Sequence, residues 1–304
     1  MNLPERVTIV EVGPRDGLQS QGATISVADK VQFVDLLSGT GLRVIEVGAF
    51  VSAKVVPQLA ESDKVFRKIH KLSGVRYPIL VPDEQGLERA LEVGAKEIAV
   101  FTAASETFNQ KNGNASIDES IEGLRLVTRR ARHEGIRVRG YVFTCFGCPY
   151  EGAVDPGKVS DVVQKLDGIG VDEFSIGDTI GLANPAQIET VFSLLMMRHR
   201  PERLALHAHD TRGTALANCY HALTLGISIF DSSAGGVGGC PFAPGATGNL
   251  ATEDLVYMMS GLGVETGVDL DKLVDASAFL EPVLKTRLPG RTYQAIRAAR
   301  VAGE

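Results

Sequence analysis

Two histidines, His207 and His209, are separated by a single alanine in the segment LHAHD. Side chains at positions i and i+2 of a β-strand point to the same face, so both imidazoles would meet in one small space. Burying two imidazoles without partners is costly, whereas a divalent metal ion would satisfy both. The spacing therefore indicates a metal site, although a pair of hydrogen-bonded core histidines would fit it as well.

Oxygen-bearing side chains follow other apolar runs in the same way. They are Asp16, Glu46, Asp178 and Asn249, with Ser175 and Thr179 beside Asp178. Oxygen ligands with few imidazoles and no thiolate pair favour Mg²⁺ or Mn²⁺ over a structural zinc ion. Arg15, next to Asp16, is either half of a surface ion pair or, in a metal-lined cup, a cation that neutralises an oxyanion or enolate.

Residues 235–248, GGVGGCPFAPGATG, hold much of the chain's excess of glycine. A flexible linker and a phosphate cradle are alternatives, but we expect a mobile lid with Cys240 at its tip, where a thiol could transfer a proton. Cys145 and Cys148 have C-x-x-C spacing, yet without a second pair they do not favour a redox or zinc site. Cys219 lies in a helical pattern and is expected in the core.

Short β-branched runs that alternate with helical patterns must position these side chains. The predicted strands are residues 7–12, 42–48, 76–81, 97–102, 136–143, 172–178, 203–209 and 227–233. Helical patterns between them, such as 27–41, 116–135 and 184–200, often end in glycine: Gly41, Gly94, Gly135, Gly170 and Gly226. Strands that alternate with helices imply a parallel sheet, and glycine is the usual signal of a helix end.

Eight such units favour an α/β fold of the closed kind, a (β/α)8 TIM barrel, over a doubly wound open sheet. The segment GPRDGLQSQ after the first strand is not the Gly-x-Gly-x-x-Gly loop of an open sheet. We predict one domain over residues 1–304, with the barrel at about 7–233, the lid loop at 235–248 and additional C-terminal helices in 249–304, around 249–262 and 269–280. The polar residues above would then converge at the carboxyl ends of the strands.

The composition limits the class of partner and compartment. The chain has 304 residues, 31 Lys+Arg against 37 Asp+Glu, a net charge of −6 and 44% hydrophobic residues. This apolar share excludes a disordered chain, and the negative charge argues against a nucleic-acid partner. No apolar stretch approaches the roughly 18 residues of a membrane span, the N-terminal residues do not read as a signal peptide, and four cysteines make no disulfide framework. We expect a cytoplasmic protein without a membrane partner.

Longer motifs cover nearly the whole chain. They are EVGPRDGLQ, FVSAKVVPQLAESD, FTAASETFNQKN, GCPYEG, SIGDTIG, HAHDTRGTALAN and GGCPFAPGATGNLATEDLVYM. With these motifs the sequence resembles the 3-hydroxy-3-methylglutaryl-CoA lyase family, a group of metal-dependent barrel enzymes. GPRDGLQ and GCPYEG carry the resemblance more specifically than the two histidines do.

The resemblance implies a retro-Claisen cleavage of an acyl-CoA thioester to acetoacetate and acetyl-CoA, and it suggests a homodimer. It implies four ligands to the divalent metal: Asp16, His207, His209 and Asn249. Arg15 would stabilise the enolate of acetyl-CoA and Cys240 would protonate it. Glu46 and Asp178 would support the metal shell and the substrate, and Gln19 and Thr179 match further polar positions. The base that takes the hydroxyl proton is Asp16 or His207, and the sequence leaves both open.

Some segments depart from the family pattern. Val81, Pro82 and Asp83 stand where the family usually has Thr-Pro-Asn, and Ser233 to Phe242 read SAGGVGGCPF rather than SVAGLGGCPY. Phe146 and Phe242 could reshape the acyl pocket for a related 3-hydroxyacyl-CoA. Further alternatives are a barrel metal hydrolase, a non-catalytic CoA- or nucleotide-binding module, and a Claisen synthase. Hydrolases of this kind usually carry the histidine pair on the first strand, and the synthases usually carry an extra C-terminal domain.

Overall fold

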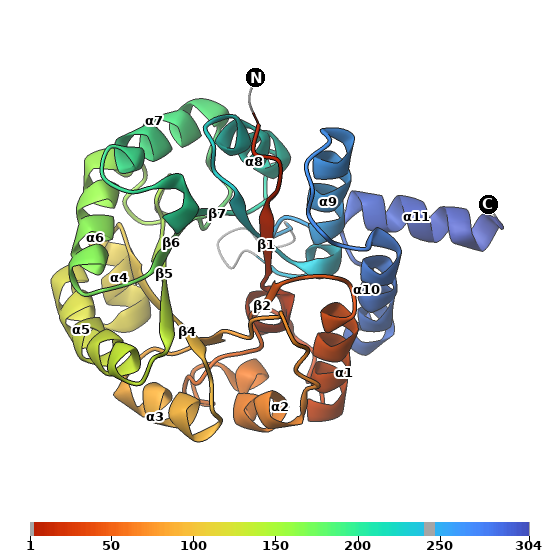
Figure 1. The fold of residues 1–304 in the computed structure, drawn as a ribbon, viewed down its shortest axis with the longest axis horizontal. Coiled ribbons are helices and arrows are strands. Elements are labelled where there is room, and N and C mark those ends of the chain that lie inside the picture. The colour runs from red at the N-terminus through yellow and green to blue at the C-terminus, as the bar shows by residue number, and fades with distance from the viewer. Residues whose placement is uncertain (1–2, 240–246, 304) are drawn as a thin grey trace.

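The computed structural model describes residues 3–239 and 247–303, so Cys240 and Phe242 lie outside the described residues. The described chain forms a ring of parallel strands surrounded by helices (Figure 1). The strands are β1 (Thr8–Glu11), β2 (Val44–Ile45), β3 (Ile79–Leu80), β4 (Glu97–Ala103), β5 (Arg137–Phe143), β6 (Glu173–Asp178), β7 (Leu204–Ala208) and β8 (Ile229–Ser232). Each lies within or overlaps a predicted strand.

The strand order is β2-β1-β8-β7-β6-β5-β4-β3, with every ladder parallel. The two ends of this order meet through isolated bridges that join Val44 to Arg76 and Ala49 to Leu80. The Ile45 amide also donates to the Arg76 carbonyl over 3.0 Å. These contacts close the ring, so the predicted (β/α)8 TIM barrel is confirmed.

The helices of the ring follow their strands in chain order. They are α1 (Val27–Ser38), α2 (Ser62–Lys68), α3 (Glu84–Glu92), α4 (Glu106–Gly113), α5 (Ile117–His133), α6 (Pro156–Gly168), α7 (Pro185–Met196) and α8 (Ala215–Thr224). Ser116 and Asn184 start α5 and α7 with capping boxes, in which a side chain accepts from a free amide of the first turn. Gly41 has a φ of +93°, and the other four predicted helix-ending glycines also have positive φ.

Three helices follow the barrel: α9 (Thr252–Gly261), α10 (Leu270–Leu284) and α11 (Arg291–Ala302). The first two correspond to predicted helices, whereas α11 has no counterpart in the sequence prediction. α10 packs against α1, and α11 lies on α9 and points away from the barrel (Figure 1). None of the helices within the described ranges combines the length and apolarity that crossing a membrane requires.

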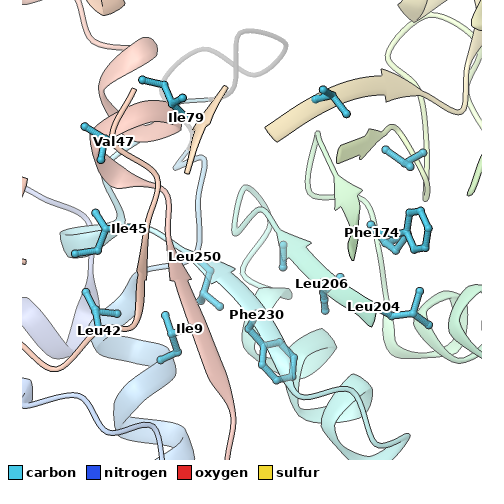
Figure 2. Packing of buried hydrophobic residues seen from close by; sticks show 14 of the residues in the cluster. Ile9, Leu42, Ile45, Val47, Ile79, Phe174, Leu204, Leu206, Phe230 and Leu250 are labelled. Atoms are coloured by element: carbon cyan, nitrogen blue, oxygen red, sulfur yellow. The ribbon is translucent and has the colours of Figure 1, made fainter. Parts of the chain in front are cut away.

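Alternation along the strands separates two interiors. Outward-facing residues such as Ile9, Phe174, Leu206 and Phe230 pack between the strands and the helices in the main hydrophobic core (Figure 2). The inner face of the barrel is different, because it carries buried charged and polar side chains, among them Arg139, Ser175 and Asp231. Those side chains form the candidate site.

Candidate active site

Two elements bring three of the candidate metal ligands together. Asp16 lies on a short π-helical turn, η1 (Gly13–Gly17), that follows β1 directly, and His207 lies on β7 with His209 just after it. The Asp16 Oδ2 atom is 3.8 Å from His207 Nε2 and 3.9 Å from His209 Nε2. The two Nε2 atoms are 3.1 Å apart. The predicted convergence of these three residues is therefore present, inside the mouth of the barrel.

The donor set fits a divalent cation. One carboxylate oxygen and two imidazole nitrogens lie within 4.8 Å of one another. Two ligands about 2.1 Å from one cation and at right angles to each other lie about 3 Å apart. The two Nε2 atoms, at 3.1 Å, match this spacing, whereas Asp16 Oδ2 lies somewhat farther from both. Both imidazoles are buried, so without a shared partner their nitrogens would face each other in a dry site.

Asn249 reaches the same place from the far end of the glycine-rich segment. An isolated bridge pairs Asn249 with His209, and the Leu250 amide donates to the Ala208 carbonyl over 3.2 Å. Its Nδ2 donates to Asp16 Oδ2 over 2.9 Å. Asn249 therefore lies beside the triad, with its amide nitrogen rather than its oxygen toward Asp16, and its role as a fourth ligand stays a prediction.

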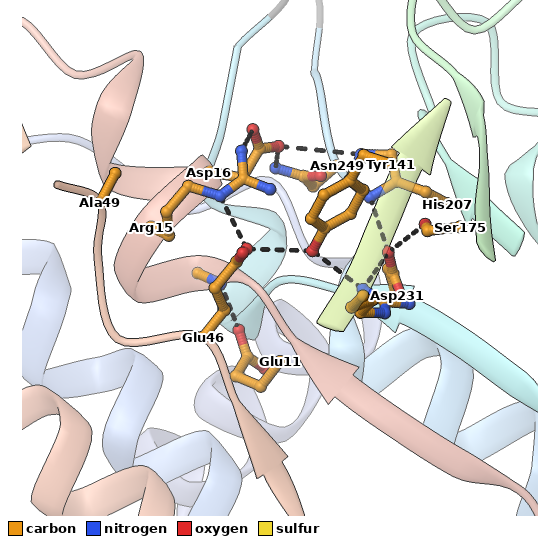
Figure 3. A network of polar contacts seen from close by, with 12 residues as sticks. Glu11, Arg15, Asp16, Glu46, Ala49, Tyr141, Ser175, His207, Asp231 and Asn249 are labelled. Carbon is orange, nitrogen blue, oxygen red and sulfur yellow. Dashed lines mark hydrogen bonds and ion pairs between the residues drawn. The ribbon is translucent and has the colours of Figure 1, made fainter. Parts of the chain in front are cut away.

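Arg15 is buried and nearly saturated with partners (Figure 3). Its Nε donates to Glu46 over 2.7 Å and its Nη1 donates to Asp16 Oδ1 over 2.5 Å. The guanidinium also lies over the Tyr141 ring, 5.0 Å from the centroid. Nη2 is buried and has no hydrogen-bond partner within the described part of the chain. Nη2 is thus a donor to which an anionic oxygen could bind.

The charges of the site support one another. Burial raises the pKa of Asp16, but Arg15 and the two histidines outweigh it and hold the pKa at about 2. Burial, together with the nearby His207, lowers the pKa of His209 to about 4. Burial would lower the pKa of Arg15, yet Glu46 and Asp16 keep it above its usual value. At neutral pH the site therefore holds an anionic Asp16, a neutral His209 and a cationic Arg15.

The other predicted residues surround the triad at different distances. Glu46 contacts Arg15 and also accepts from the Tyr141 hydroxyl over 3.0 Å. Asp178 accepts from the backbone amides of Leu182 and Ala183 over 2.8 and 3.0 Å, so it fixes the loop after β6.

Three predicted residues have polar or cavity contacts of their own. Ser175 donates to Asp231 over 2.8 Å, Thr179 accepts from the Thr144 amide over 2.8 Å, and Gln19 lines a cavity of about 600 Å³ beside Leu288. The proposed acid, Cys240, lies outside the described residues.

Three residues of the site were missed by the sequence analysis: Arg139, Tyr141 and Asp231. Arg139 is fully buried, and its guanidinium contacts Glu173, Tyr141 and Asp231. Arg139 and Tyr141 are two residues apart on β5, so their side chains share one face of the strand, the face that lines the inside of the barrel. The available signal was an arginine in the middle of a predicted strand, between Val138 and Gly140, because an arginine is rarely buried without an ionic partner.

The three cysteines within the described residues are not part of the Asp16, His207 and His209 triad. Cys145, Cys148 and Cys219 are buried and make no disulfide among the described residues. The Cys145 thiol donates to the Val142 carbonyl over 3.0 Å, and the Cys148 sulfur lies 3.0 Å from the Ser105 hydroxyl. Phe146 is part of the main hydrophobic core.

Comparison with known proteins identifies the family. The family model described as HMGL-like matches residues 6–280. The chain belongs to the HMGL-like family. It is 49% identical to the cytoplasmic 3-hydroxy-3-methylglutaryl-CoA lyase of Rattus norvegicus over 299 residues, which cover 98% of this chain and 87% of the rat protein.

Solved structures of HMGL-like proteins superpose on the whole barrel. The hydroxymethylglutaryl-CoA lyase of Pseudomonas aeruginosa is 50% identical, with a TM-score of 0.96 and coverage of 98% of this chain and 99% of that one. An HMG-CoA lyase from Acinetobacter baumannii, solved with coenzyme A and 3-methylmalate, is 36% identical, with a TM-score of 0.92 and coverage of 97% and 96%. The HMGL-like match includes Arg15, Asp16, both histidines and Asn249.

Proposed function

We propose that this protein is a carbon–carbon lyase that cleaves 3-hydroxy-3-methylglutaryl-CoA to acetoacetate and acetyl-CoA with the help of a divalent metal ion. The observation that carries the proposal is the triad of a half-buried Asp16 and two buried histidines, His207 and His209, beside Nη2 of Arg15, which has no partner among the described residues. Family membership and the lyase names of relatives with about half their residues identical support the same reaction.

The cation is Mg²⁺ or Mn²⁺ in this proposal, because the donor set combines oxygen atoms with imidazoles and contains no thiolate. Its ligands are Asp16, His207, His209 and Asn249. When bound, it supplies Lewis-acid polarisation of the substrate oxygens that it contacts. Glu46 and Asp178 hold Arg15 and the β6 loop in place around it.

Two residues compete for the role of base at the tertiary hydroxyl. His207 has Nε2 turned to the triad and Nδ1 3.2 Å from Asp231, so neither nitrogen is free to take a proton once the ligands are in place. Asp16 has a second carboxylate oxygen, shared with Arg15. Both residues therefore stay candidates for the base, because Asp16 Oδ1 already accepts from Arg15 Nη1 and the pKa of Asp16 is held at about 2.

Loss of the hydroxyl proton leads to cleavage of the carbon–carbon bond, which leaves acetoacetate and the enolate of acetyl-CoA. The Nη2 donor of Arg15 would stabilise the enolate oxygen, since a buried guanidinium needs no reorganisation to meet the developing charge. Cys240 would then give the enolate its proton. That role rests on the sequence motif alone, because Cys240 lies outside the described residues.

Several broader expectations belong to the same proposal. The substrate is an acyl-CoA thioester, the protein is a homodimer in the cytoplasm without nucleic-acid or membrane partners, and residues 1–304 form one domain. The alternative is a lyase of this family that acts on a related 3-hydroxyacyl-CoA. The histidine pair lies on the seventh strand rather than the first, which speaks against the barrel metal hydrolase.

The test is a panel of 3-hydroxyacyl-CoA thioesters incubated with chelator-treated protein, with and without Mg²⁺ or Mn²⁺. We expect equal amounts of acetoacetate and acetyl-CoA from 3-hydroxy-3-methylglutaryl-CoA, and only when metal is present. Faster cleavage of another thioester would assign the alternative substrate. Release of free coenzyme A, or no cleavage of any thioester by metal-loaded protein, would contradict lyase activity.

A further inference from the structure

Asp231 lies at the centre of a polar cluster inside the barrel that none of the predicted roles includes. It belongs to β8, and the parallel ladder pairs its backbone with that of His207 on β7. Its side chain is buried, with 1% of the residue exposed. Figure 3 shows the carboxylate directed at the back of the His207 ring, away from Asp16. Asp231 thus lies behind His207, on the side of the ring opposite Asp16.

The Asp231 carboxylate is surrounded by donors. Oδ1 accepts from Arg139 Nη2 over 2.6 Å, and Oδ2 accepts from Arg139 Nη1 over 3.1 Å and from the Ser175 hydroxyl over 2.8 Å. The remaining contact of Oδ2 is His207 Nδ1, at 3.2 Å. An ionised carboxylate has about four acceptor positions and no proton to donate. The His207 nitrogen that faces it must therefore carry the hydrogen.

The two histidines of the triad differ in this respect. His207 has a carboxylate behind Nδ1, whereas the buried Nδ1 of His209 has no partner in the described ranges. A proton fixed on Nδ1 leaves the Nε2 lone pair of His207 pointing at the triad. Ligating histidines commonly hold their second nitrogen against a carboxylate in this way, which sets the tautomer and the ring orientation.

We propose that Asp231 is a positioning residue that fixes His207 in its Nδ1-protonated tautomer and presents an unprotonated Nε2 to the divalent cation. Arg139 and Ser175 hold the carboxylate in place for this task. The inference rests on the proposed function in one respect, because His207 is taken as a metal ligand.

The test compares two isosteric variants that each remove one carboxylate from Arg139. Glu173 accepts from Arg139 Nε over 2.6 Å and is as buried as Asp231, and its other contact is to Arg137. Asp231→Asn and Glu173→Gln therefore both break a buried ion pair with Arg139, but only Asp231→Asn alters the contact to His207. Mn²⁺ binding is measured by calorimetry and by electron paramagnetic resonance, without substrate.

We expect Asp231→Asn to weaken Mn²⁺ binding by about 10- to 100-fold, the usual range for loss of such a partner, and Glu173→Gln to bind Mn²⁺ like the wild type. Equal weakening in both variants would overturn the inference, because it would trace the effect to general loss of an Arg139 ion pair. Unchanged binding in Asp231→Asn would overturn it as well.

A second measurement needs neither metal nor a stable variant. Long-range ¹⁵N–¹H correlation spectra of metal-free wild-type protein with labelled histidine report which nitrogen of His207 carries the proton. We expect the proton on Nδ1, and a proton on Nε2 would overturn the inference. If the wild type binds no Mn²⁺, the proposed metal function fails, while the tautomer still decides the role of Asp231.

Discussion

Arg15 shows how a single buried side chain can be fixed in place and still keep a donor for chemistry. Nε and Nη1 are engaged by Glu46 and Asp16, and the planar face of the guanidinium rests on Tyr141. Only Nη2 is left over in the described structure. A lysine could reproduce the charge but not this fork of separate donors.

Arg15→Lys should therefore reduce kcat far more than KM. Removing one preorganised donor to a developing oxyanion typically costs about 10²- to 10³-fold in kcat, and we expect a loss in that range. Steady-state kinetics with saturating Mn²⁺ measures it. Arg6→Lys is the control, because Arg6 pairs with Glu265 at an exposed surface, and it should behave like the wild type. A kcat within about twofold of wild type for Arg15→Lys would refute the role of its fork.

At the scale of residues, local motifs predicted the triad but not its support. The H-x-H spacing and the strand-end aspartate could be read from neighbours along the chain. Asp231 on β8 and Arg139 on β5 meet only through the closed barrel, because they are 92 residues apart in the sequence. Asp178 is expected to support the metal shell and the substrate, and this role stays a prediction; in the structure its carboxylate accepts from the backbone amides of the following loop.

Among the elements, the π-helical turn after β1 carries two adjacent residues of the candidate site, Arg15 and Asp16. The amides of Arg15, Asp16 and Gly17 all donate to the Val12 carbonyl, which curls the chain tightly over the end of β1. Gly17 faces the segment after β8, where a Cβ atom would lie 2.8 Å from the Val237 carbonyl oxygen and 2.9 Å from the Ser233 hydroxyl. The turn and this segment must therefore pack backbone to backbone.

Gly17→Ala should disturb the site without touching a ligand. The added methyl group meets backbone on the opposite side, so the turn must shift and carry Asp16 with it. We expect weaker Mn²⁺ binding and a loss of about 1–3 kcal/mol in unfolding free energy, as for other overpacked sites. Calorimetric Mn²⁺ titration and denaturant unfolding measure the two effects.

Gly22→Ala supplies the matched control for this substitution. A Cβ at Gly22 meets nothing within 4 Å, and its φ is not in the left-handed region. It should bind Mn²⁺ and unfold like the wild type. If Gly17→Ala proves equally silent, close packing of the turn is not what positions Asp16.

The elements that the sequence did not predict lack local signals. α11 is preceded by Gly290, which offers no side-chain cap, and the first amides of the helix instead donate to Asp254 on α9. That cap comes from 37 residues away, so no window of sequence contains it. α10 continues to Leu284 although Pro282 lies inside it, whereas the predicted helix stopped before this proline. The proline is near the helix end, where few bonds remain to be lost.

At the scale of the whole molecule, the eight alternating strands and helices were predictable from the sequence. Apolar β-branched runs and helical patterns that end in glycine repeat along the chain. The joint between the barrel and the C-terminal helices was not predictable. Two buried carboxylates lie there: Glu11 accepts from the Ala234 amide over 2.9 Å, and Glu253 on α9 accepts from the Gly235 amide and from Ser277 on α10. They hold consecutive residues of the segment that leads into the glycine-rich loop.

These carboxylates should make the stability of the molecule depend on pH. Burial raises the pKa of Glu253 from 4.5 to about 8, and Glu11 nearby adds to the shift. An acid whose pKa is raised by folding stabilises the fold fully below its unfolded pKa and loses that stabilisation as the pH rises through the folded pKa. The unfolding free energy of the wild type should therefore fall between about pH 5 and pH 8.5.

The Glu253→Gln side chain keeps a hydrogen-bond acceptor but cannot ionise. The unfolding free energy of this variant should therefore fall less than that of the wild type over the same pH range. Between pH 5 and pH 8.5, the unfolding free energy of the variant should rise relative to that of the wild type by more than about 1.4 kcal/mol, which corresponds to one pKa unit. Some slope should remain, because burial also raises the pKa of Glu11 to about 7. Urea unfolding of metal-free protein measures the difference, with Glu122→Gln as an exposed control. Parallel pH profiles for wild type and Glu253→Gln would show that Glu253 is ionised throughout, and that the joint tolerates a buried charge.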